Sequence, residues 1–284
     1  MDGVSLSELL GVAVVDSAGV FSGRVREVAV ALQEDSACVS GLIVKTASGD
    51  RMVMREALAA VSGTGVRAAG PASEWPAFVG GEGLLLLERD LLDQQIIDVH
   101  GRKVVRVNDV DLAPEPVNGH VVLRIRDVDV GARGAVRRLL KGVVPAGTLR
   151  LLLGRIPPRG IPWEFVDLIE TDPARRVKLK ISHDRLARLH PADLADILEE
   201  LAPAEREAVF ETLDEEVAAE ALEEIDPKLQ VSIVESLDSD RAADIVEEMN
   251  PDAAADLLGD LSEETSEEIL EEMQPAEQIG RAHV

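Results

Sequence analysis

The sequence is poor in aromatic, sulfur-containing and basic residues, and each shortage excludes a class of function. It has no tyrosine, two tryptophans and four phenylalanines, so aromatic stacking on nucleic-acid bases is not expected. Its single cysteine, Cys38, excludes an intrachain disulfide and a thiolate metal cage, which fits a reducing cytosol. Lysine and arginine number 29 against 54 acidic residues, which argues against nucleic-acid binding through a basic surface.

Long apolar runs and catalytic motifs are also missing. No apolar run approaches the ~18 residues that a membrane helix needs, and the N-terminus lacks the basic and apolar segments of a signal peptide. Neither G-x-S-x-G, HExxH nor a P-loop occurs, and the five histidines are scattered. His190, directly before Pro191, is expected to cap a helix rather than bind a metal. We therefore expect no enzymatic activity.

The C-terminal string leads us to expect that the chain is a fragment. The string IGRAHV at 279–284 is a translation of the start of a common sequencing adapter. We expect 277–284 to be adapter-derived and the natural protein to continue past about Ala276. A genuine polar tail is the alternative.

Charge divides the chain into two parts of different class. Up to Arg176 there are 21 basic and 23 acidic residues, and after it 8 basic and 31 acidic. The first part is rich in valine and glycine, and the second in alanine, leucine and acidic residues with periodic proline. A salt-adapted proteome would acidify both parts alike, so we expect two domain types, β followed by α.

The first part contains a duplication. The segment from Leu9 to Val28 aligns with that from Leu91 to Val110 at an offset of 82. Each copy consists of short β-branched runs between turns, such as the turn at 16–19 in the first copy. Several short strands in ~80 residues indicate a small antiparallel barrel, which leaves no exposed edges.

These copies resemble the PRC-barrel family of small six-stranded docking modules, most clearly in the pattern LLD-x2-IID-x2-G-x3-VRVNDV at 91–110. The resemblance implies one barrel at 1–75, a second at 84–145 and a linker at 146–182. What the barrels would dock onto stays open, because the fold alone does not specify a function.

A basic stretch lies between Arg124 and Arg159, with nine basic and two acidic residues. Arg137, Arg138 and Lys141 are expected on a short helix. The charges could simply be solvated, or could contact acidic lipids, RNA or the acidic half of the chain. Among the contacts we favour intramolecular pairing with the acidic half, because that partner is already present.

The second part repeats every twelve residues. Helix-start signals, proline in five of the eight positions, occur at Pro191, Pro203, Glu215, Pro227, Ser239, Pro251, Glu263 and Pro275. Several follow good N-cap residues, namely Asp214, Asp226, Asp238, Asn250 and Ser262. Apolar residues recur on one helix face in each unit, as in Ile197, Leu198 and Leu201. The pattern predicts an all-α solenoid over 183–276, of either hand, because such short helices cannot bury their apolar stripe alone.

This part resembles the intracellular N domain of MgtE magnesium transporters and channels. The resemblance rests on LHPADLADILEEL at 189–201 and on the twelve-residue cadence that follows. It implies a cytosolic Mg²⁺ sensor, located at the inner face of the plasma membrane through a transporter. It also implies CBS domains downstream and a pore in the same chain or in a partner subunit. A homodimer is compatible with the resemblance, and no nucleic-acid partner is expected.

The acidic residues supply a physical basis for ion sensing. Between 189 and 275 there are 29 acids, and only Arg206, Lys228 and Arg241 could offset them. Mg²⁺ needs only one or two carboxylates because it keeps several waters. As candidate ligands of weak, regulatory Mg²⁺ sites we choose acids from three of the predicted helices: Glu223, Glu224, Glu247, Glu248, Asp252, Asp256 and Asp260. The alternatives are another divalent ion, or a solvated acidic face on a protein–protein scaffold that binds no metal.

Overall fold

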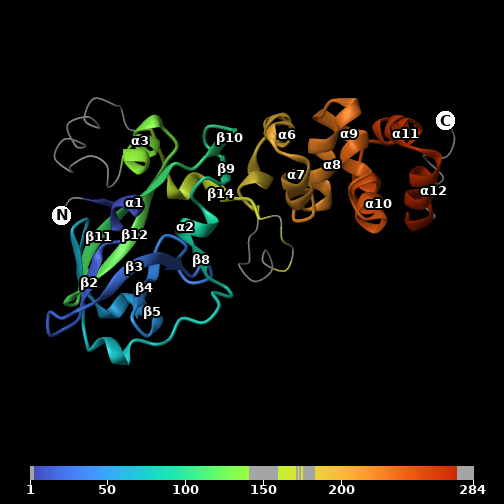
Figure 1. Ribbon diagram of the computed structural model, residues 1–284. Helices are drawn as coiled ribbons and strands as arrows, with labels where there is room; N and C mark the ends of the chain where they lie inside the picture. Colours follow the sequence, from blue (N-terminus) through green and yellow to red (C-terminus); the bar gives the residue numbers. More distant parts are fainter. Residues whose placement is uncertain (1–2, 141–158, 171, 173, 175–182, 274–284) are drawn as a thin grey trace. The chain divides into compact units, whose positions relative to one another are not determined.

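The computed structural model describes residues 3–140, 159–170, 172, 174 and 183–273 (Figure 1). The chain forms two compact units. The first comprises 1–96, 105–166 and 177–180, and the second comprises 97–104, 167–176 and 181–284. A β-rich unit followed by a series of helices confirms the predicted fold class. None of the described helices is long and apolar enough to cross a bilayer.

The larger sheet of the first unit is built mainly from the first sequence copy. Its strands are β2 (Ala13–Val15), β3 (Phe21–Val30), β4 (Val39–Thr46), β5 (Gly49–Met54), β6 (Leu58–Ser62), β7 (Gly65–Ala68) and β8 (Leu85–Leu86). They pair in the order β5-β4-β3-β2-β7-β6, with β8 on β3. The predicted turn between β2 and β3 is present: the Asp16 carboxylate accepts the N–H groups of Ala18 and Val20. Gly19 adopts a φ of 77° there, a conformation that glycine favours.

The second sheet contains the long strands of the second copy. It has the order β1-β11-β12-β13, with β1 (Val4–Ser5), β11 (Asp109–Val117), β12 (His120–Asp129) and β13 (Gly160–Pro162). The two copies exchange their short first strands: β1 pairs with β11 through Val4 and Leu112, and β8 pairs with β3 through Leu85 and Val30. Both copies, predicted at 1–75 and 84–145, therefore contribute to one unit. The pairings among the described residues do not by themselves close a barrel, so the PRC-barrel resemblance stays a prediction.

Short helices and turns connect these strands, namely α1 (Leu6–Leu9), η1 (Arg55–Ala57), η2 (Ala72–Glu74), α2 (Leu87–Asp90) and α3 (Ala132–Leu140). The segment predicted as a linker, 146–182, is more than a linker where it is described. It contains β13, η3 (Trp163–Phe165) and β14 (Val166–Leu168). Ile161 and Trp163 are buried, and the burial of these apolar side chains stabilises the fold of this segment. The rest of the segment lies largely outside the described residues, as does 277–284.

A three-stranded sheet has the order β10-β9-β14, with β9 (Gln95–Asp98) and β10 (Lys103–Arg106). Residues 97–104 of this hairpin group with the helical unit rather than with the rest of the second copy. Ile97 belongs to the core of the helical unit, and Val99 and Val104 pack against that core. Apolar burial thus joins this hairpin to the start of the helical series.

Residues 183–273 form a 3₁₀ turn, η4 (Leu186–Arg188), and seven α-helices: α6 (Pro191–Glu200), α7 (Pro203–Phe210), α8 (Glu215–Glu224), α9 (Pro227–Val234), α10 (Ser239–Glu248), α11 (Pro251–Asp260) and α12 (Glu263–Glu272). Every helix begins where the twelve-residue cadence predicts, and the last predicted start, Pro275, lies outside the described residues. The helices form two rows, because α6, α8, α10 and α12 pack in succession and α7, α9 and α11 do the same (Figure 1). The spatial repeat is therefore a pair of helices, 24 residues long.

The caps and the apolar stripe explain why these segments are helical. Asp226, Asn250 and Ser262 accept backbone N–H bonds in the first turns of α9, α11 and α12. His190 Nδ1 accepts the N–H of Ala192 at 3.3 Å, which confirms its predicted capping role. The predicted stripe is buried: Ile197, Leu198, Leu201, Val209, Phe210, Leu213, Ile233, Val234, Ile245, Val246 and Met249 form one core, with Leu237 packed against it.

Candidate functional site

The predicted ion ligands lie on α8, α10 and α11. Six of them are exposed, and Glu247 is partly buried. In the described part of the chain, no three acidic, histidine or cysteine side chains come together in an arrangement that could hold a metal ion. For Asp252, Asp256 and Asp260 the reason is geometric. Each step of four residues rises ~6 Å along a helix, so the outer two are ~12 Å apart, whereas Mg²⁺ contacts its oxygen ligands at ~2.0 to 2.1 Å.

Glu223 has a structural partner. Its Oε1 atom accepts the backbone N–H of Asn250, the N-cap residue of α11, at 2.6 Å. One repeat earlier, Glu199 Oε1 accepts the N–H of Asp226, the N-cap residue of α9, at 3.1 Å. A carboxylate near the C-terminus of its own helix is disfavoured by the helix dipole, but here it lies at the N-terminus of another helix, where negative charge is favoured. Cations are therefore not the only groups that stabilise the acids near the helix C-termini.

Two of the three basic residues of this segment contact backbone carbonyls. Arg206 donates to the carbonyl oxygens of Leu198 and Leu201, both at 2.8 Å, at the C-terminus of α6. Arg241 donates to the carbonyls of Phe210 and Leu213 beyond α7. These arginines satisfy carbonyls that a helix end leaves without an internal partner. Both guanidinium groups remain charged, and that of Arg241 also pairs with a surface acid.

Gln230 repeats the role of Arg206 exactly one helix pair later. Its Nε2 atom donates to the carbonyls of Leu222 and Ile225, at 2.8 and 3.0 Å.

Arg241 also forms an ion pair with Glu215 at 2.6 Å. The pKa of the Glu215 carboxyl lies below its ordinary value, because its own backbone N–H and the Arg241 guanidinium bond to the charged form.

Other acids of the helical unit hold the β9–β10 hairpin. Asp193 forms an ion pair with Arg102 at 2.8 Å, and Glu200 accepts the backbone N–H of Val104 at 2.9 Å. The first helix of the series therefore uses part of its acidic face for folding contacts. The remaining exposed acids are the ones available to ions in solution.

The densest group of acids lies on α12, and none of its members is among the predicted ligands. Five glutamates line one open surface hollow: Glu263, Glu264, Glu267, Glu268 and Glu271. The sequence signal for this group is the spacing i, i+1, i+4, i+5 and i+8, which places all five on adjoining faces of one helix. The regular i, i+4, i+8 spacing of the α11 aspartates favours those residues instead when the sequence alone is considered.

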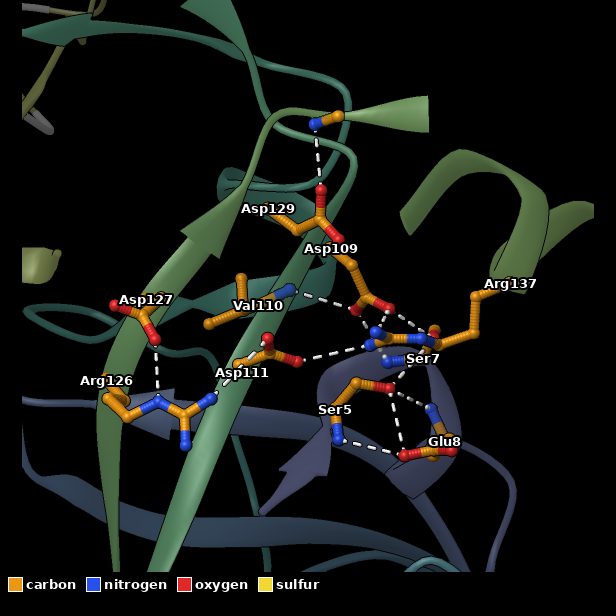
Figure 2. Close-up of polar contacts among 11 residues, drawn as sticks. Ser5, Ser7, Glu8, Asp109, Val110, Asp111, Arg126, Asp127, Asp129 and Arg137 are labelled. Atoms are coloured by element: carbon orange, nitrogen blue, oxygen red, sulfur yellow. Dashed lines mark hydrogen bonds and ion pairs between the residues drawn. The ribbon is translucent and has the colours of Figure 1, made fainter. Parts of the chain in front are cut away.

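A second polar cluster lies buried in the first unit and was missed in the sequence (Figure 2). Asp109 is fully buried. Its Oδ1 accepts the N–H groups of Ser7 and Val110, and its Oδ2 accepts the Ser7 hydroxyl and an Arg137 N–H at 3.0 Å. The same Arg137 nitrogen donates to Asp111 at 3.1 Å. Arg137 thus lies between two carboxylates, a charge-assisted arrangement.

The first copy contains the counterpart of Asp109. Glu27, 82 residues earlier, is also buried, and its Oε1 accepts the N–H groups of Val28 and Glu88, both at 2.8 Å. Each carboxylate therefore binds the N–H of its following residue and an N–H of the short helix that belongs to the other copy. These contacts accompany the exchange of β1 and β8. Burial raises the pKa of both carboxyl groups above their ordinary values.

Arg137 corrects the interpretation of the basic stretch. Intramolecular pairing is confirmed for this residue, but its partners are Asp109 and Asp111 of the β-rich unit. The predicted partner, the acidic C-terminal half, was wrong for this arginine. A buried guanidinium needs fixed carboxylates close by, and β11 supplies them directly beneath α3.

The helical segment matches the model of a known protein family. Residues 189–279 match the family model described as the MgtE intracellular N domain. The helical segment is therefore similar to this domain. The match covers the α6–α12 series, with its two-row packing and its acidic surface.

A search of the curated proteins finds no match. Among solved structures, the chain resembles one described as the crystal structure of the soluble part of a magnesium transporter, with a TM-score of 0.33 and 20% sequence identity. The likeness covers 35% of this chain and 40% of the solved chain. The likeness to the MgtE intracellular N domain therefore rests on the family model.

Proposed function

We propose that this protein is the cytosolic regulatory part of a magnesium transport system, and that its MgtE intracellular N domain responds to Mg²⁺. The observation that carries the proposal is the match of 189–279 to that domain. The role is regulatory rather than enzymatic. It requires a pore, in a longer form of this chain or in a partner subunit, and CBS domains that pass on the response.

The charge distribution supports a response to cations. Of the three basic residues between 189 and 275, Arg206 and Arg241 donate to helix-end carbonyls. The many exposed carboxylates repel one another, by roughly 3 kcal/mol for two charges ~6 Å apart at an effective dielectric near 20, before screening. A divalent cation between two of them removes that repulsion.

The arrangement of the acids favours several weak sites over one tight site. Carboxylates on one helix face lie a turn apart, so they present themselves to an ion in pairs rather than in threes, and Mg²⁺ can bind such pairs with most of its water retained. A site filled at ten times its dissociation constant contributes about 1.4 kcal/mol. Four such state-selective sites approach the ~5.5 kcal/mol needed to invert a 1:99 population.

The proposed ligands differ in what else they do. Glu223 is already bonded to Asn250, so any role in ion binding adds to a folding role. Glu224, Glu248, Asp256 and Asp260 are exposed on α8, α10 and α11, and we propose them as the principal ion contacts. Glu247 and Asp252 lie beside them in the sequence and complete the set.

A thermal-melting experiment tests the proposal on the whole chain. Millimolar MgCl₂ should raise the melting temperature well beyond NaCl of equal ionic strength. A variant with Glu224→Gln, Glu248→Gln, Asp256→Asn and Asp260→Asn should melt higher without Mg²⁺, because repulsion is relieved, and should gain less from Mg²⁺. A matched control neutralises four exposed acids of the first unit, Glu34, Glu74, Glu115 and Glu164, and should keep the full Mg²⁺ response.

The alternative function is a protein–protein scaffold whose acidity only keeps it soluble. An equal response of the wild type to both salts would favour it. Mn²⁺ and Ca²⁺ titrations under the same conditions would show which dication the acidic surface prefers.

A further inference from the structure

The buried carboxylates of the two copies in the first unit have different hydrogen-bond partners. In the second copy, Asp109 Oδ2 binds the Arg137 guanidinium. In the first copy, the equivalent oxygen of Glu27, Oε2, accepts one hydrogen bond, the N–H of Arg89 at 3.1 Å. Among the described residues no basic side chain pairs with Glu27. The equivalent carboxylates therefore differ in their partners. Asp109 of the second copy binds a guanidinium group, and Glu27 of the first copy is bonded to backbone N–H groups.

A pocket of about 460 Å³ lies at Glu27. Its apolar wall includes Ile43, Phe78 and Leu86, and Glu88 also lines it. Glu27 itself is 7% exposed, so its charged group is largely withdrawn from water but borders the pocket.

The arginines that line this pocket are engaged elsewhere. Arg26 forms an ion pair with Asp50, and Arg89 forms one with Asp90 at 2.6 Å. Their charges are thus offset by these aspartates, which leaves the carboxylates of Glu27 and Glu88 as the excess charge. An aromatic ring and two aliphatic side chains beside a carboxylate suit a planar, weakly hydrated cation with an apolar stem better than a compact ammonium ion.

We propose that this pocket binds a guanidinium group, that of an arginine side chain presented by a partner protein, with Glu27 as its anionic anchor. The bound guanidinium would reproduce in the first copy the contact that Arg137 makes with Asp109 in the second. Its methylene stem would lie along Phe78 and Leu86. The site is separate from the acidic surface of the helical unit and does not depend on the response to Mg²⁺.

The test uses the ¹⁵N-labelled whole chain and N-acetylarginine amide as the probe. Saturable shifts are expected in the amide signals of Val28, Glu88 and Arg89, whose N–H groups bond to Glu27. N-acetylcitrulline amide, which has the same shape without the charge, should bind at least tenfold more weakly. Agmatine separates the sources: tighter binding of the amide than of agmatine supports an arginine within a protein chain. Agmatine binding more tightly than the amide would overturn the choice of a protein partner, and equal binding of the citrulline probe would overturn the guanidinium assignment.

A substitution at Glu27 and the pH dependence of binding test the role of Glu27 as the anchor. Glu27→Gln should weaken the arginine probe at least tenfold, whereas Glu34→Gln, at an exposed acid outside the pocket, should leave its affinity unchanged. If Glu27→Gln does not fold, the wild type alone decides: affinity should fall as the pH is lowered from 7.5 toward 5, because protonation of the anchor removes the attraction. Affinity that is independent of pH, or unaffected by Glu27→Gln, would show that Glu27 is not the anchor.

Discussion

Glu223, in the last turn of α8, accepts the backbone N–H of Asn250, the residue that caps α11, at 2.6 Å. The two residues are 27 positions apart, and the same contact joins Glu199 to Asp226 one repeat earlier. Glu223 is one of many similar acids near the helix C-termini in the sequence, and in the structure it connects the two rows of helices.

Glu223→Ala should lower the free energy of unfolding by about 1 kcal/mol, because a charge-assisted bond to a helix N-terminus is lost. Glu199→Ala should act in the same direction. Urea denaturation of the whole chain, followed by far-UV circular dichroism, measures the change. Glu224→Ala is the control, since that exposed neighbour forms no such bond, and its removal should be neutral or slightly stabilising. Equal losses at 223 and 224 would contradict the proposed connection.

Arg206 should be replaceable by glutamine but not by leucine. At position 230 a glutamine already donates to two helix-end carbonyls in the equivalent place. Arg206→Leu leaves the carbonyls of Leu198 and Leu201 without these donors, and we expect a loss of about 2 kcal/mol. Arg206→Gln should lose less than about 1 kcal/mol. Denaturant midpoints of the two variants give the answer, and similar losses would show that charge rather than hydrogen bonding matters at this site.

The buried carboxyls should make the first unit more stable in mild acid. The pKa values of Glu27 and Asp109 are raised in the folded state by burial, so the native protein binds protons at a higher pH than the unfolded chain. Stability contributed by these groups is therefore lost as the pH rises from the ordinary carboxyl pKa through the raised one. The acidic surface adds its own pH dependence, so the informative quantity is the difference between wild type and Glu27→Gln. That variant should gain less stability than the wild type between pH 7 and pH 5.

Cutting the chain between the two copies should not separate them. Val79 lies in the connection and is 89% exposed, so a protease site inserted there should be cleaved without unfolding the protein. Because β1 pairs with β11 and β8 pairs with β3, the two halves should elute together in size-exclusion chromatography under native conditions. Separation of the fragments without denaturant would contradict the strand exchange.

The helical unit could be predicted closely from the sequence, and the first unit only in part. Proline and N-cap residues mark each helix start directly, and the apolar stripe specifies the buried face. The pairing of next-but-one helices could not be foreseen, because a twelve-residue cadence is equally compatible with contacts between successive helices. The contact between Glu223 and Asn250 depends on that pairing, so this contact could not be predicted either.

In the first unit, the strands β2 to β5 follow the predicted β-branched runs. The strand exchange escaped prediction because β1 and β8 are two residues long, too short to show any periodicity. The two copies also have similar residue patterns. The sequence therefore does not show whether a strand pairs within its own copy or with the other copy. Asp109 and Glu27 gave a weak signal, since they are acids at equivalent positions of the two copies and each is followed by a valine.

The two-row packing of the helical unit also has a mechanical consequence. One row contains four helices, from α6 to α12, and the other contains the three that lie between them in sequence. Drawing neighbours of one row together, while the other keeps its spacing, shortens one side of the stack and curves it. A small decrease in the spacing of helices within one row therefore produces a larger displacement of the last helix of the series.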